Sequence, residues 1–248
     1  MWTLDLLLLV AAVFVFAGFV KGVIGLGLPT VVLALLTVAV GLKEAMALML
    51  IPSFLTNVWQ GALGGHLRMI LQRLWPLLLA ACLVIWLGAE LLTRLDVAWL
   101  SALLGGTLWT YALVGLLAPK LPTPGKAEVW VSPLVGAVNG LLTGLTGSFV
   151  VPAVPYLQSL GLPRDAFVQA MGVLFTVSTV ALAVALGAQE LFTVELGVLS
   201  GLAFIPALLG MFAGTWVRGR LTESRFRRVF FLSLLVLGAY IVLRAVAG

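Results

Sequence analysis

Lys21 is the first residue of the chain whose chemistry attracts attention. It ends an uncharged apolar stretch, residues 6–20, and three glycines follow it closely: Gly22, Gly25 and Gly27. A charged side chain inside hydrocarbon is costly unless it is paired or hydrated. Two interpretations of Lys21 stay open. It supplies positive charge beside an anion site, or it caps the first span and extends its ammonium to the lipid headgroups.

The glycines after Lys21 belong to a phrase that occurs twice. The first copy runs from Gly18 to Pro29 and the second from Gly136 to Pro152. Glycine turns let a ligand approach the backbone, and a helix that starts after such a turn directs unsatisfied N–H groups toward it. We therefore expect helix starts at Pro29–Thr30 and Ser148–Phe149, which together would form a cradle for an anion.

Polar side chains are denser in the second copy of the phrase. The residue aligned with Lys21 there is Asn139, a neutral donor. The substrate-binding residues predicted from the two copies are Lys21, Gly22, Gly25, Gly27, Pro29, Asn139, Thr143, Gly144, Thr146, Gly147 and Ser148. The alternative for any single glycine or threonine among them is close packing of helices through small residues.

The third apolar segment of each half adds amide side chains. Asn57 and Gln60 lie in the first half, where Ser53 shares a helix face with Asn57, and Gln169 lies in the second half. An amide within hydrocarbon needs a partner, so Asn57, Gln60 and Gln169 are also predicted to bind substrate. The nearby hydroxyls have a simpler alternative, a hydrogen bond to their own helix.

The composition of the chain predicts the kind of helices that must position these residues. The chain is 62% hydrophobic and 9% charged, with a mean hydropathy of +1.22, whereas a soluble domain is about 25% charged. We expect an all-α membrane protein, a polytopic bundle of about ten hydrophobic segments. These are Leu4–Val20, Thr30–Val40, Ala45–Leu63, Leu74–Leu92, Val97–Leu117, Val129–Leu142, Phe149–Leu160, Ala166–Leu186, Val194–Trp216 and Val229–Leu243.

The second segment of each set of five is short. At about 1.5 Å per residue, segments 30–40 and 149–160 reach only about 16–18 Å, less than the roughly 30 Å of a hydrocarbon core. We expect half-helices, or helices lengthened by the glycine-rich turn before them. Whether these two segments cross the bilayer stays open.

Loop charges bear on the orientation of the two halves. The loop after the third segment holds His66, Arg68 and Arg73, whereas the equivalent loop of the second half holds Glu190 and Glu195. Basic loops face the cytoplasm, so equivalent loops fall on opposite sides. We expect two inverted five-segment repeats, 1–118 and 129–248, joined by a polar linker at 119–128, with both termini outside. If both short segments are re-entrant, the repeats become parallel.

Several classes of function are disfavoured. The sequence shows no nucleophile triad, nucleotide-binding loop or paired intramembrane carboxylates, and the single cysteine and single histidine offer no metal cluster. We expect no enzyme, no cofactor and no metal. The net charge of +5 comes from loops that set topology rather than from a surface for nucleic acid.

The duplicated phrase resembles the TauE/SafE family of bacterial membrane transporters, described as sulfite exporters. The resemblance rests on two sets of glycine, proline and alanine positions and covers essentially the whole chain. They are Gly18, Gly22, Gly25, Gly27, Pro29, Gly41 and Ala45, then Gly136, Gly140, Gly144, Gly147, Pro152, Gly161 and Ala166. Members often carry a denser triple-glycine run, which this chain lacks in both halves.

The resemblance implies a secondary transporter or uniporter for sulfite or an organosulfonate such as sulfoacetate. It would export the anion across the bacterial inner membrane by alternating access, with the site near the midplane between the two glycine-rich turns. The alternatives are a transporter of another small anion such as a carboxylate, or an intramembrane enzyme or assembly factor. The expected partners are the anion and membrane lipid, and a homo-oligomer is left open.

Overall fold

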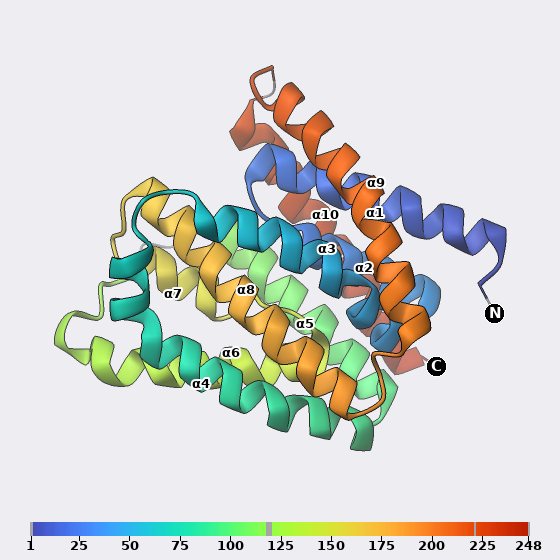
Figure 1. Ribbon diagram of the computed structural model, residues 1–248, viewed down its shortest axis with the longest axis horizontal. Helices are drawn as coiled ribbons and strands as arrows, with labels where there is room; N and C mark the ends of the chain where they lie inside the picture. Colours follow the sequence, from blue (N-terminus) through green and yellow to red (C-terminus); the bar gives the residue numbers. More distant parts are fainter. Residues whose placement is uncertain (1, 118–120, 221, 248) are drawn as a thin grey trace. The chain divides into compact units, whose positions relative to one another are not determined.

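A computed structural model describes residues 2–117, 121–220 and 222–247, and within them every regular element is a helix (Figure 1). The helices are α1 (Leu4–Ile24), α2 (Leu28–Val40), α3 (Leu42–Ala62), α4 (Leu67–Arg94), α5 (Val97–Leu117), α6 (Glu128–Thr146), α7 (Ala153–Ser159), α8 (Arg164–Ala188), α9 (Val194–Arg218) and α10 (Glu223–Ala247), with a 3-10 turn at Gly125–Ala127. The all-α fold class is thereby confirmed. Of the expected linker 119–128, positions 119 and 120 lie outside the described residues.

Seven of the described helices are long and apolar enough to cross a membrane. They are α1, α4, α5, α6, α8, α9 and α10. Helix α3 has the length of α1, 21 residues, but Asn57 and Gln60 interrupt its apolar run. The chain is a multi-pass membrane protein.

The two short segments differ from each other. Helix α2 begins one residue before Pro29, close to the expected start. The expected start at Ser148–Phe149 is wrong, because residues 148–150 are not helical and α7 covers only Ala153–Ser159. Pro152 explains the delay, since a residue before proline is steered away from helical backbone angles.

The helices divide into two compact units that mix the two halves of the sequence. The first unit contains Met1–Pro52, Val97–Leu116 and Leu191–Gly248. Its main contact joins α1 to α9, which cross each other in Figure 1. A Cβ on Gly18 would clash with the Ala207 carbonyl, and one on Gly22 would clash with the Met211 carbonyl. Because both numbers rise together, α1 and α9 run in the same direction where they meet at close range.

The second unit contains Ser53–Asp96 and Leu117–Glu190. Its main contact joins α4 to α6 in the same way. A Cβ on Gly140 would clash with the Ala81 carbonyl, and one on Gly144 with the Ile85 carbonyl. In each unit, therefore, the helix that carries the glycine phrase packs in parallel on the fourth helix of the other half of the sequence.

Within the first unit, α2 runs alongside α10. A Cβ on Gly27 would lie 3.3 Å from the ring of Phe230, and the Arg244 guanidinium donates to the Val38 carbonyl at 2.8 Å. Both helices therefore point the same way. Phe230 lies seven residues into α10, so the turn before α2 sits about 10 Å along that helix from its start. The glycine turn thus lies beside α10, about two helical turns after the start of that helix.

Candidate functional site

The ends of α1 and α6 fix the register between the two glycine phrases. Gly25 ends α1 with φ 85° and donates its N–H to the Lys21 carbonyl at 2.7 Å, while Gly147 ends α6 with φ 73° and donates to the Thr143 carbonyl at 2.7 Å. Lys21 therefore corresponds to Thr143. The sequence alignment with Asn139 is wrong by one helical turn, because glycines recur every four residues in the second copy and a four-residue slip still matches.

Lys21 lies inside the protein at the last turn of α1. Its residue surface is only 5% exposed, which contradicts the alternative in which the ammonium extends to the lipid headgroups. A buried lysine requires nearby groups that stabilise its charge.

Free backbone donors follow Lys21 directly. The N–H groups of Leu26, Gly27, Leu28 and Thr30 make no hydrogen bond within the described part of the chain, as expected for the first turn of a helix. Gly27, with φ 108°, adopts the left-handed geometry that the turn requires, and Pro29 occupies a first-turn position where its missing N–H costs nothing.

The second glycine phrase is held by its own side chains. Two carbonyl oxygens, of Phe149 at 3.0 Å and Val151 at 3.2 Å, face one amide atom of Asn139 and identify it as the nitrogen. The Ala153 N–H also points to this atom, but from 3.4 Å, so the two nearer carbonyls decide the assignment. Asn139 is therefore a donor to the non-helical segment 148–152.

Three further residues complete this arrangement. Thr143 Oγ1 donates to the Ser148 carbonyl at 3.0 Å. Thr146 Oγ1 donates to the Leu142 carbonyl at 2.7 Å and accepts from the Ser148 N–H at 3.3 Å. All four polar residues, Asn139, Thr143, Thr146 and Ser148, are buried. They shape the segment through which the second phrase would meet a ligand.

Gly22 and Gly144 allow close packing between helices. Each abuts the backbone of the neighbouring parallel helix, α9 for Gly22 and α4 for Gly144, where no side chain fits. Their lack of a side chain is explained by helix packing.

Gln60 and Gln169 form a reciprocal clamp between α3 and α8. Gln60 Nε2 donates to the Val168 carbonyl at 2.9 Å, and Gln169 Nε2 donates to the Gly61 carbonyl at 2.9 Å. The Oε1 of Gln169 accepts the His66 N–H at 2.8 Å. Both ends of the Gln169 amide are thus bound to backbone, beside the close approach of Gly61 and Gly172.

Three further polar residues of the second unit are fully buried. Ser53 and Asn57 of α3 and Ser178 of α8 are each 0% exposed, and the Ser53 and Ser178 hydroxyls have no hydrogen-bond partner among the described residues. A buried hydroxyl without a protein partner calls for a water or a ligand. The sequence placed Ser53 on the face of Asn57, and Ser178 is one of the hydroxyls in the matching segment of the second half.

Arg227 is a candidate that loop-charge reasoning missed. Of the five arginines in 218–228, it is the one whose residue surface is not exposed. Its guanidinium lies 5.6 Å from the ring centroid of Phe231, and the adjacent Phe230 is the residue that touches Gly27. The signal was available in the pattern, since Arg227 shares the apolar face of α10 with Phe230, Phe231 and Leu234.

The cations and hydrogen-bond donors described above are suited to a small anion. No three His, Cys, Asp or Glu side chains gather to hold a metal ion within the described ranges. Donors predominate instead: Lys21, Arg227 and backbone N–H groups in the first unit, and hydroxyls and amides in the second.

Comparison with known proteins agrees with this chemistry. No match was found among curated proteins or among solved structures. Residues 10–241 match the family model described as sulfite exporter TauE/SafE, which covers most of the chain and includes both glycine phrases. The chain therefore belongs to the TauE/SafE family of sulfite-exporter-type membrane transporters.

Proposed function

We propose that this protein is a secondary transporter or uniporter that exports a small sulfur-containing anion, either sulfite or an organosulfonate such as sulfoacetate, across the bacterial inner membrane. One observation supports the proposal above the others. A buried lysine, Lys21, is followed within nine residues by four free backbone N–H groups, those of Leu26, Gly27, Leu28 and Thr30. A compact oxyanion would accept hydrogen bonds from these N–H groups and is attracted by the charge of the lysine.

The break between α1 and α2 suits a transporter. It leaves free N–H groups at the start of α2, beside Phe230 of α10. Discontinuous helices whose N-terminal ends point at an anionic group are a common device in secondary transporters. Within the first unit, Lys21, Gly25, Gly27 and Pro29 would contact the anion.

The second unit offers its own candidate ligand-binding residues, in the other glycine phrase and in α3 and α8. Asn139, Thr143, Thr146, Gly147 and Ser148 shape one turn, and Asn57, Ser53 and Ser178 contribute buried polar groups. The parallel α1–α9 and α4–α6 pairs fit inverted repeats, for which alternating access is the usual cycle. Export of an anion is favoured by about 2.3 kcal/mol per charge at 100 mV, inside negative.

Flux through purified protein in liposomes tests the proposal. Radiolabelled sulfite is loaded inside, and its efflux is followed with and without an inside-negative potassium diffusion potential. We expect efflux above that of protein-free liposomes, accelerated by the potential and inhibited by sulfoacetate. Failure of sulfite to cross, together with efficient transport of acetate, would instead establish the second candidate, a carboxylate transporter, whose substrates share the same anionic charge.

A further inference from the structure

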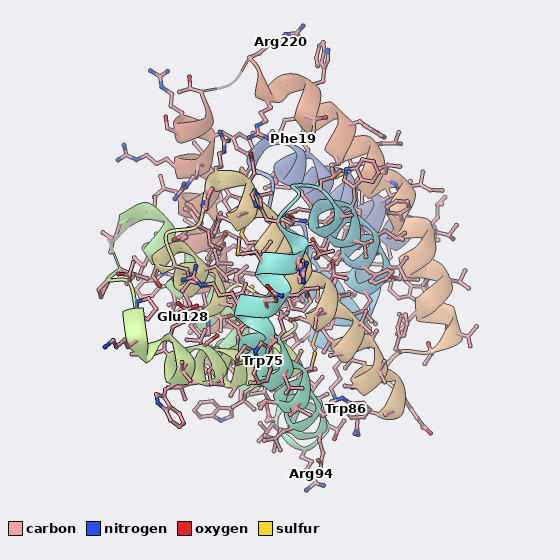
Figure 2. The ribbon with its side chains drawn as sticks, turned by 60° about the vertical axis from the view of Figure 1, so that its left-hand side comes forward. Phe19, Trp75, Trp86, Arg94, Glu128 and Arg220 are labelled. Atoms are coloured by element: carbon pink, nitrogen blue, oxygen red, sulfur yellow. The ribbon has the colours of Figure 1, made fainter. Side chains whose placement is uncertain are left out.

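The connection between α9 and α10 carries a dense positive charge. Residues 218–228 hold five arginines and one acidic residue, Glu223. Arg218, Arg220, Arg225 and Arg228 are all exposed, and no ion pair neutralises them among the described side chains. Arg220 projects from the end of α9, and its guanidinium stacks 3.8 Å from the ring centroid of Trp216 (Figure 2). An exposed tryptophan beside arginines is typical of the membrane interface.

An apolar groove begins where this charge ends. It is shallow and open, because all the residues that line it lie on one helix, α10: Val229, Leu232, Ser233, Val236, Leu237 and Tyr240. Arg225, Val229, Leu232 and Val236 succeed one another at intervals of three or four residues, so they share a face of the helix. From Val229 to Tyr240 the face extends about 16 Å, roughly the depth of one bilayer leaflet.

Arginines at the start of α10, followed by an apolar groove about as long as one leaflet is thick, match one kind of ligand. We propose that α10 carries a binding site for an anionic phospholipid, with Arg225 and Arg228 holding the phosphate and the Val229–Tyr240 groove holding an acyl chain. This site is separate from the anion site of the proposed function, because Arg225 and Arg228 lie on the exposed side of α10 and Arg227 on its protein-facing side.

A second copy of the chain is a weaker match for the groove. Two-fold symmetry would pair the same surface of both copies. The two basic clusters would then meet on one side of the membrane, where like charges oppose association.

Native mass spectrometry of the detergent-purified full chain tests the site. The protein is offered dioleoyl phosphatidylglycerol or dioleoyl phosphatidylcholine, which share acyl chains and differ in headgroup charge. We expect preferential retention of phosphatidylglycerol, reduced about 10- to 30-fold by the double substitution Arg225→Gln/Arg228→Gln, since each basic residue near an anionic lipid contributes about fivefold. The control, Arg68→Gln/Arg94→Gln, removes two exposed arginines elsewhere and should leave retention unchanged.

A second variant tests the groove without changing the charge. Val236→Trp places a bulky ring in the groove at a residue that is 73% exposed, and it should lower retention at least fivefold. Val198→Trp, at an exposed valine of α9, is the matched control. Equal retention of the two lipids by the wild type, full retention by either test variant, or displacement by inorganic phosphate would overturn the proposal. So would a wild-type dimer that Val236→Trp dissociates, because the groove would then hold a second copy.

Discussion

Lys21 and Thr143 occupy the same position in their helices, four residues before the glycine that ends α1 or α6. From this position Thr143 reaches past the end of its helix and donates to the Ser148 carbonyl at 3.0 Å. A side chain at this position therefore faces the turn that follows. In the first phrase the same position carries a cation, and this difference is the main chemical asymmetry between the two copies.

Replacement of Lys21 should weaken anion binding. Lys21→Met keeps the length of the side chain and removes its charge, so we expect affinity for sulfite to fall about 10- to 100-fold, the value of a hydrogen bond to a charged group. Lys21→Arg should retain more affinity than Lys21→Met. Titration calorimetry measures both, with Lys126→Met, an exposed lysine of the linker, as control. Unchanged affinity in Lys21→Met would remove this residue from the site.

Arg227 should assist the approach of the anion. Its half-buried guanidinium lies one helical turn before Phe230, which touches Gly27, so we expect Arg227→Gln to lower the rate of sulfite efflux several-fold at low substrate concentration. The defect should shrink at high ionic strength, because salt screens the charge. Arg218→Gln removes an exposed charge from the same connection and should have a smaller effect. Equal defects in the two variants would argue against a specific role for Arg227.

The effect of replacing a helical glycine with alanine should depend on what surrounds that glycine. Gly140→Ala places a Cβ against the Ala81 carbonyl, whereas a Cβ on Gly106 meets nothing within 4 Å. We expect Gly140→Ala to cost about 1–3 kcal/mol through overpacking, and Gly106→Ala to be neutral or slightly stabilising because alanine favours a helix. Thermal unfolding in detergent gives the comparison. Similar melting temperatures for the two variants would show that α4 and α6 are less tightly packed.

The sequence predicted the helices well because their signal is local. Apolar runs identified all ten segments, including the two short ones, and Glu90 pairs with Arg94, four residues later on the same face of α4. The register of the two glycine phrases was missed, since glycines spaced by four match themselves after a slip of one turn. The delayed start of α7 depends on the proline at 152 and on hydrogen bonds from Asn139.

Local sequence patterns do not predict contacts between residues that are far apart in the chain. Gln60 and Gln169 were recognised as amides in need of partners, but those partners are backbone carbonyls 108 residues away. Their identity depends on the packing of α3 against α8, which no spacing in the sequence expresses. Arg227 was missed for a different reason, because charge counting treats all five arginines of its connection alike and ignores the helix face on which each one lies.

Gln169 should contribute more to stability than to ligand binding. Gln169→Met preserves the volume of the side chain but leaves the Gly61 carbonyl and the His66 N–H without partners. We expect a loss of about 1–3 kcal/mol in unfolding free energy, with sulfite affinity of the folded protein nearly unchanged. Combined thermal unfolding and calorimetry separate the two effects. A large loss of affinity with normal stability would instead assign Gln169 to the ligand.

Ser200 should compensate for the proline inside α3. Pro52 has no N–H for the Leu48 carbonyl, and the buried Ser200 hydroxyl donates to that carbonyl at 2.8 Å while it accepts from the Ile51 N–H at 3.0 Å. Ser200→Ala should therefore cost about 1–3 kcal/mol. In a Pro52→Ala background, where the helix can supply the missing N–H itself, the same substitution should cost less. A double-mutant cycle of thermal or denaturant unfolding measures the difference. Strict additivity would show that the hydroxyl does not act through the break at Pro52.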